Sequence, residues 1–197
     1  KKIHVFVEKP MCLNYREYFN IKNNLIKNPN LKFSSNLILR NAPQFKKVSN
    51  KIKNKSLKKI YYIQGEYNYG RLEKIVNGWR SKTPNYSVTL GGGIHLIDLA
   101  CFFLKKRAIK VIFSKNSTFI QKFNSDKFFS SNKTNNFKKI NMKYTNLEKT
   151  RVLKSFIDSI KYKKKPLVGK NDVLNAMAIG LSLEKSFRSK KWTKIEY

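Results

Sequence analysis

Residues 3–10 read Ile-His-Val-Phe-Val-Glu-Lys-Pro, a short and mostly apolar run that ends abruptly in a charged pair and a proline. The apolar part predicts a buried parallel strand over residues 3–8. Pro10 is expected to close this strand, because proline has no amide hydrogen to give to a sheet ladder. A buried parallel strand needs neighbours to pair with. We therefore expect the chain to open inside a larger domain.

The segment that follows predicts the rest of a parallel βαβ unit. Asn14 is expected to cap a helix over residues 15–28, where apolar side chains recur at helical spacing. Residues 31–40 contain the apolar run Leu37-Ile38-Leu39 and predict a second strand. Strand, helix and strand in this order favour a right-handed crossover within one sheet.

Further along the chain, the hydrophobic pattern changes between helical and extended periods. Residues 114–150 are rich in Ser, Asn, Lys and Phe, and we expect them to be poorly ordered. The expected strands are 57–69 and 108–113, and the expected helices are 43–53, 94–104, a segment from Thr150 that ends before Pro166, and 172–188.

Composition limits the class of protein. The 197 residues carry a net charge of +32, which raises nucleic-acid binding as an alternative function. Of the 43 basic residues only seven are arginine, the residue that base and phosphate sites favour, so we expect at most nonspecific nucleic-acid binding. No apolar stretch of about 18 residues predicts a membrane span. Cys12 and Cys101 are not spaced as metal ligands, and we expect two free buried thiols, no metal and a cytoplasmic protein.

The order and spacing of four short motifs indicate a family. The motifs are Val7-Glu8-Lys9-Pro10, Arg40-Asn41-Ala42-Pro43, Trp79-Arg80 and Gly91-Gly92-Gly93-Ile94-His95-Leu96-Ile97-Asp98. Each motif alone is weak, but together they resemble the glucose–fructose oxidoreductase and inositol dehydrogenase family, called Gfo/Idh/MocA. The resemblance covers residues 1–113 and 150–197.

The resemblance implies an α/β fold. Residues 1–42 would be the end of a Rossmann-like parallel sheet. Residues 43–197 would be a truncated α/β domain with an open sheet, through which the protein would form a homo-oligomer. It also implies hydride transfer between NAD or NADP and a small sugar, cyclitol or nucleotide-sugar alcohol. The Gly-x-Gly-x-x-Gly phosphate turn is absent from the sequence. We therefore expect a partial or inactive copy that binds dinucleotide poorly.

The resemblance also assigns roles to single residues. Lys9, at the carboxyl end of its strand, would hydrogen-bond the substrate oxygen and offset developing charge. His95 would be the general base, since imidazole titrates near neutral pH. Asp98, three residues on, would either orient the imidazole or cap locally. The expected cofactor contacts are Glu8, Lys9, Pro10, Arg40, Trp79 and Arg80, and the expected substrate contacts are Lys9, Tyr86, Gly93, His95 and Asp98.

One departure stands out in this set. Many family members carry an aspartate four residues before the histidine, and Gly91 occupies that position here. A catalytic set of lysine, aspartate and histidine is therefore incomplete in this sequence. Either Lys9 and His95 act with help from Tyr86 or Asn85, or the proton relay is altered.

Overall fold

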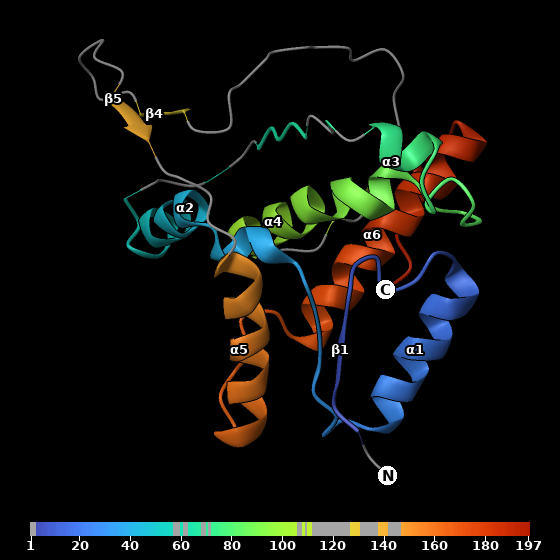
Figure 1. Cartoon of the computed structure of the whole chain (residues 1–197), viewed down its shortest axis with the longest axis horizontal. Coiled ribbons are helices and arrows are strands. Elements are labelled where there is room, and N and C mark those ends of the chain that lie inside the picture. The colour runs from blue at the N-terminus through green and yellow to red at the C-terminus, as the bar shows by residue number, and fades with distance from the viewer. Residues whose placement is uncertain are drawn as a thin grey trace.

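The computed structural model describes residues 3–56, 60, 63–67, 70, 72–105, 108, 110–111, 127–130, 138–141 and 147–197. Figure 1 shows β1 between the helices α1 and α5, with α4 and α6 crossing the molecule above them. The structure is mostly helical and contains one small parallel sheet. No helix among the described residues is long and apolar enough to cross a membrane.

The predicted βαβ unit is confirmed, but its first strand is shorter than the predicted 3–8 and is not buried, since Val5 is 42% exposed. Strand β1 (Val5–Val7) pairs in parallel with β2 (Phe33–Ser35), and helix α1 (Tyr15–Lys27) connects them. Asn14 caps α1 as expected, because its side chain accepts a hydrogen bond of 2.9 Å from the Glu17 amide. The sheet therefore brings the carboxyl ends of two parallel strands side by side, which is where ligands bind in open α/β sheets.

The second strand is shorter than predicted. The apolar run expected to extend it instead enters a 3-10 helix, η1 (Ile38–Asn41). β1 ends at Val7, so among the described residues the chain beyond Ser35 has no ladder partner. The Leu37 amide bonds locally to the Ser35 carbonyl at 2.8 Å. The turn also carries the buried Arg40 toward a carboxylate on another helix.

The middle of the chain contains several helices and one segment without regular structure. The expected helices 43–53 and 94–104 are confirmed. The strand expected at 57–69 is wrong at the described residues 60 and 63–67, which lie outside strands. Ile63 and Tyr67 are both exposed there, so no buried face exists to fix an alternating strand. The elements are α2 (Pro43–Lys53), α3 (Leu72–Val76), the π-helical η2 (Thr89–Gly93) and α4 (Ile94–Leu104).

Two predicted helices and one predicted strand are confirmed in the C-terminal part of the chain. The segment expected to lack order contains a described antiparallel pair, and the following helix begins three residues earlier than predicted. The remainder of 114–150 lies outside the described residues. Strand β3 (Lys110–Val111) pairs with β6 (Thr193–Lys194), and β4 (Lys127–Ser130) pairs with β5 (Lys138–Asn141). The two helices are α5 (Leu147–Lys161) and α6 (Lys170–Ser189).

Helix α6 lies at the centre of the core. It packs against α1, α4 and η2, and most of its middle turns are buried. Gly180 allows the closest approach, because a Cβ atom there would lie 3.0 Å from Leu90 Cδ2 and 3.3 Å from Ile94 Cδ1. This contact holds η2 and the start of α4 against α6. Both cysteines are free thiols as expected, although only Cys12 is fully buried.

Candidate functional site

The carboxyl end of β1 carries the first site residues. The Lys9–Pro10 peptide bond is cis, and the half-buried Lys9 donates a hydrogen bond from Nζ to the Gly91 carbonyl oxygen. The neighbouring Glu8 accepts a 2.9 Å hydrogen bond from Asn36, just beyond the end of β2. Lys9 is therefore joined to a segment 82 positions away in the sequence, as the motif order predicts.

The glycine run forms the wall opposite Lys9. Thr89–Gly93 is one π-helical turn that leads directly into α4, and Gly91 and Gly92 are buried. Single π-turns are frequent at functional sites. Ser87 fixes the turn, because its hydroxyl accepts from the Leu90 amide at 3.1 Å and donates to Glu184 of α6 at 2.6 Å. The glycines thus present backbone to the space beside Lys9.

His95 lies one turn further along, in the first turn of α4, and is only 5% exposed. Its Nδ1 atom is buried and has no hydrogen-bond partner among the described residues. Burial first, and then the charges of Lys9 and Lys149, lower the pKa of His95 to about 3. The expectation of an imidazole that titrates near neutral pH is therefore wrong. His95 is a neutral hydrogen-bonding group at pH 7.

Three predicted residues form one aromatic and cationic cluster. Arg80 Nε donates to the Tyr86 hydroxyl at 3.0 Å. The same guanidinium stacks 4.7 Å from the ring centroid of Trp79, whose ring meets that of Tyr86 edge-on at 5.9 Å. Trp79 remains 64% exposed. The cluster therefore offers a flat aromatic face and a fixed cation near the glycine turn.

The space beside Gly91 is filled. A Cβ atom at this residue would overlap the Tyr86 hydroxyl and lie 2.5 Å from its Cζ. Where the family resemblance leads one to expect an aspartate side chain, the structure places the phenol of Tyr86. Lys9 Nζ bonds the carbonyl of the same glycine, so Lys9 and Tyr86 both converge on Gly91.

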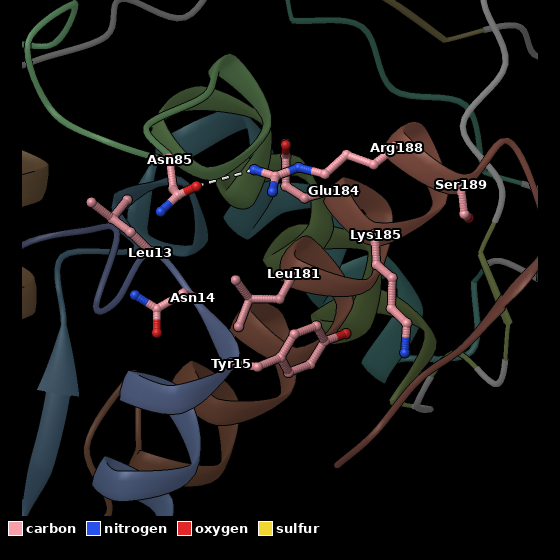
Figure 2. Close-up of a pocket in the computed structure, with 9 residues that line it drawn as sticks. All are labelled: Leu13, Asn14, Tyr15, Asn85, Leu181, Glu184, Lys185, Arg188 and Ser189. Carbon is pink, nitrogen blue, oxygen red and sulfur yellow. Dashed lines mark hydrogen bonds between the residues drawn. The ribbon is translucent and has the colours of Figure 1, made fainter.

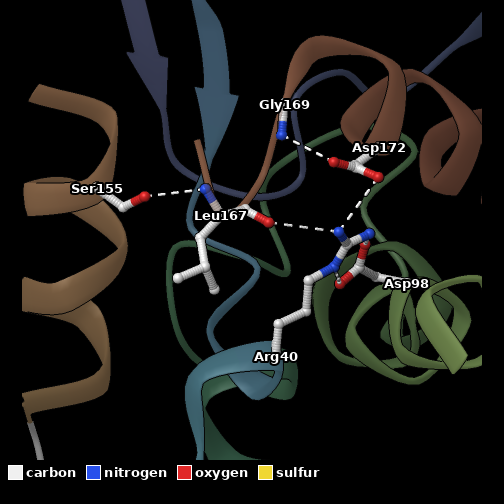
Figure 3. Close-up of polar contacts among 6 residues, drawn as sticks. All are labelled: Arg40, Asp98, Ser155, Leu167, Gly169 and Asp172. Carbon is white, nitrogen blue, oxygen red and sulfur yellow. Dashed lines mark hydrogen bonds and ion pairs between the residues drawn. The ribbon is translucent and has the colours of Figure 1, made fainter. Parts of the chain in front are cut away.

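Arg40 and Asp98 are brought together, but as a buried ion pair. Arg40 Nε and Nη2 donate to the two oxygens of Asp98 at 2.8 and 2.5 Å, with 4% and 1% of the side chains exposed. Figure 3 shows Arg40 also reaching Asp172 and the Leu167 carbonyl. Asp98 thus makes no bond to His95 Nδ1. That Asp98 orients the imidazole stays a prediction. Cofactor contact for Arg40 and substrate contact for Asp98 stay predictions.

Burial has the largest effect on the pKa of Asp98. It raises the pKa of the Asp98 carboxyl from 3.8 to about 6, against the lowering effect of Arg40. Asp172 supplies the second acidic partner at 3.2 Å and also accepts from the Gly169 amide at 2.8 Å, which caps α6. Sequence reasoning recognised Asp172 only as a helix start. A carboxylate in the first turn of a helix was the available signal, but nothing in the sequence pointed it toward Arg40.

A separate pocket of about 480 Å³ lies where α1 begins and α6 ends (Figure 2). Asn85 lines it and accepts a 3.2 Å hydrogen bond from Arg188. Lys9 and His95 are not among its lining residues, so the pocket and the predicted catalytic residues do not coincide. The lining residues are Leu13, Asn14, Tyr15, Asn85, Leu181, Glu184, Lys185, Arg188 and Ser189.

Comparison with known proteins adds evidence on the fold. No protein-family model and no curated protein sequence matches the chain. Solved structures do. A putative oxidoreductase from Thermotoga maritima superimposes with a TM-score of 0.73 at 14% identity, over 98% of this chain and 73% of that one. Myo-inositol 2-dehydrogenase from Lactobacillus plantarum gives 0.72 at 15% identity, over 98% and 74%.

A third similar structure carries ligands. Scyllo-inositol dehydrogenase from Lactobacillus casei, solved with NAD(H) and scyllo-inositol, superimposes with a TM-score of 0.67 at 13% identity, over 97% of this chain and 73% of that one. At such identities the likeness speaks for the fold. The chain therefore has the fold of oxidoreductases of the Gfo/Idh/MocA type.

Proposed function

We propose that this chain carries the reacting part of a nicotinamide-dependent oxidoreductase site for a sugar-like alcohol. The observation that supports it most is the meeting of Lys9, from the carboxyl end of β1, with the glycine turn that leads to His95. These two segments lie 82 positions apart in the sequence. The likeness in fold to inositol dehydrogenases supports the substrate class.

Each group has a distinct task in this proposal. The Lys9 ammonium binds the reacting oxygen of the substrate and offsets negative charge as it develops there. His95, neutral at pH 7, accepts a hydrogen bond from a substrate hydroxyl through its unpartnered Nδ1. Burial keeps this atom dry, so a hydroxyl placed there satisfies a polar group that otherwise has no partner among the described residues.

The residues present fit the nicotinamide end of a dinucleotide. The exposed ring of Trp79, with Arg80 stacked on it, offers a face and a cation beside the glycine turn. Glu8, Lys9 and Pro10 lie at the adjacent strand end. When bound, the nicotinamide would accept or give the hydride. The sequence contains no phosphate-binding turn of the Gly-x-Gly-x-x-Gly type, so we propose that the 197-residue chain holds the dinucleotide weakly.

Two measurements test the proposal. Titration with NADH and NADPH should give a dissociation constant well above roughly 10 µM, which corresponds to about −7 kcal/mol; tighter binding would refute the claim of weak affinity. At millimolar NAD or NADP, a panel of cyclitols and sugars should yield reduced nicotinamide slowly. Replacement Lys9→Met should lower that rate at least about 100-fold. Equal rates in both proteins would refute the assignment of the site.

The charge of +32 favours a second proposal, a non-catalytic binder of polyanions. Four exposed lysines, Lys161 and Lys163 to Lys165, lie at the end of α5 and directly after it. If this run forms a site, replacing its lysines by glutamine should lower the affinity for a random-sequence duplex DNA and reduce the salt dependence of binding. Removal of the same number of scattered lysines serves as the control. If both sets of replacements lower the affinity equally, net charge alone explains the binding and no local site exists.

A further inference from the structure

The hydroxyl of Tyr86 occupies an unusual position. It fills the space that a side chain at residue 91 would take, and the Lys9 ammonium bonds the carbonyl of the same residue. Gly91 is buried, and a Cβ atom there would also lie 2.9 Å from Tyr86 Cε1. Any residue larger than glycine would therefore expel the phenol. The glycine and the tyrosine depend on each other.

The surroundings of this hydroxyl are cationic. Arg80 Nε donates to Tyr86 Oη at 3.0 Å, and its guanidinium lies 5.8 Å from the tyrosine ring centroid. A tyrosine hydroxyl has one proton to donate and two lone pairs to accept with. Because Arg80 fills an acceptor position, the proton of Tyr86 remains to be donated elsewhere. Negative charge left on the oxygen after donation would face Arg80 directly and Lys9 across Gly91.

We propose that Tyr86 is a catalytic residue, the group that exchanges a proton with the reacting oxygen of the substrate. This inference rests on the proposed function. In the reducing direction, a bound dihydronicotinamide would supply the hydride to the carbonyl carbon, and the C=O π bond would become a C–O single bond. The Tyr86 O–H bond breaks and its proton goes to the carbonyl oxygen. The products are an alcohol, the oxidised nicotinamide and a tyrosinate, which regains a proton from solvent. Oxidation follows the same steps in reverse.

The other polar groups near Tyr86 are less suited to transferring a proton. His95 is buried beside the cation of Lys9, an environment that opposes taking up a proton. Asp98 has both oxygens bound by Arg40. Lys9 donates to a backbone carbonyl and suits the task of binding the substrate oxygen. Among the described residues at this turn, the tyrosine hydroxyl combines a transferable proton with a cation fixed on its oxygen.

The replacement Tyr86→Phe tests this directly, because it removes the hydroxyl and keeps the ring that packs on Trp79. At millimolar NADH or NADPH with a ketocyclitol, we expect kcat to fall about 100-fold or more, in the range of general acid catalysis, and KM to change less than about threefold. Tyr162→Phe, at a 63% exposed tyrosine after α5, is the matched control and should leave both constants unchanged. A kcat within threefold of the original protein would overturn the role of Tyr86.

A second variant guards against a merely structural effect. In Tyr86→Ala/Gly91→Asp the ring is gone, and a carboxyl group can enter the space that it leaves. We expect this protein to recover at least tenfold in kcat over Tyr86→Ala alone; no recovery would contradict a proton-transfer role at this position. If the original chain forms no product while Lys9→Met behaves identically, the proposed function fails and this inference with it. If the original chain is active and Tyr86→Phe is equally active, only this inference fails.

Discussion

Replacing Arg40 by methionine should destabilise the fold strongly at neutral pH. Arg40 and Asp98 are 4% and 1% exposed, and both carboxylate oxygens accept from the guanidinium. Methionine keeps much of the side-chain volume but leaves a buried carboxylate without its bidentate partner. Breaking a buried pair in this way costs about 3–5 kcal/mol. That loss is a large share of the roughly 5–15 kcal/mol that stabilises a typical domain.

The effect of Arg40→Met should depend on pH in a defined direction. Burial already raises the pKa of the Asp98 carboxyl to about 6 in the presence of Arg40, and removing the cation raises it further. A pKa that is higher in the folded than in the unfolded state gives stability that is present at low pH and lost as pH rises through the folded value. The variant therefore gains stability on acidification from pH 7.5 to 6, where the original protein gains little. The difference in unfolding free energy between the original protein and the variant should therefore narrow between pH 7.5 and pH 6. The narrowing is at most about 2 kcal/mol, because one pKa unit corresponds to about 1.4 kcal/mol.

Urea unfolding followed by circular dichroism at pH 7.5 and pH 6 measures both effects. His95 makes the same contribution to the pH dependence of stability in both proteins, so that contribution cancels in the difference. The double variant Arg40→Met/Asp98→Leu is the control, since it removes the stranded charge and should recover most of the loss. A difference below about 1 kcal/mol at pH 7.5, or one that does not change with pH, would refute this reasoning.

Three further predictions concern the site and its supports. Burial and the charge of Lys9 lower the pKa of His95 to about 3, so its ring proton resonances should not titrate above pH 4.5. The free energy of unfolding should fall as pH falls from 6.5 toward 3. An NMR titration midpoint near pH 6.5 would contradict this. Gly180→Val should lower the free energy of unfolding by about 1–3 kcal/mol because its side chain meets Leu90, while Gly70→Val, with no neighbour within 4 Å, should not change it. Asn14→Ala should cost about 1 kcal/mol through the lost cap of α1, and an unchanged urea midpoint would contradict that.

The sequence was most informative where local rules and motif order agree. The apolar run before Pro10, the cap at Asn14 and the helical spacing that follows all describe one βαβ unit, and the structure has it. The pairing of Lys9 with the glycine turn came from motif order, because no local rule connects segments 82 positions apart. Apolar periodicity failed at Leu37–Leu39, where the absence of a ladder partner favours a 3-10 turn.

The sequence could not predict what depends on tertiary burial. His95 was expected to titrate near neutral pH, but its pKa is set by desolvation and by Lys9, neither of which is visible in one dimension. The sequence also carried no sign that Arg40, grouped with the cofactor contacts, is buried and paired with Asp98 and Asp172. The substitution at Gly91 was visible as a gap in a motif. Only the packed structure shows that the ring of Tyr86 fills that gap.

The most direct measurement is the transfer of a labelled hydride at the Lys9 site. A cyclitol deuterated at its carbinol carbons would be incubated with the 197-residue chain and millimolar NAD or NADP, and deuterium in the nicotinamide product would be read by mass spectrometry. We predict label in the reduced nicotinamide with the original chain and at least about 100-fold less with Lys9→Met. Label at the same background level in both proteins would contradict the assignment of Lys9 and the glycine turn to an oxidoreductase site.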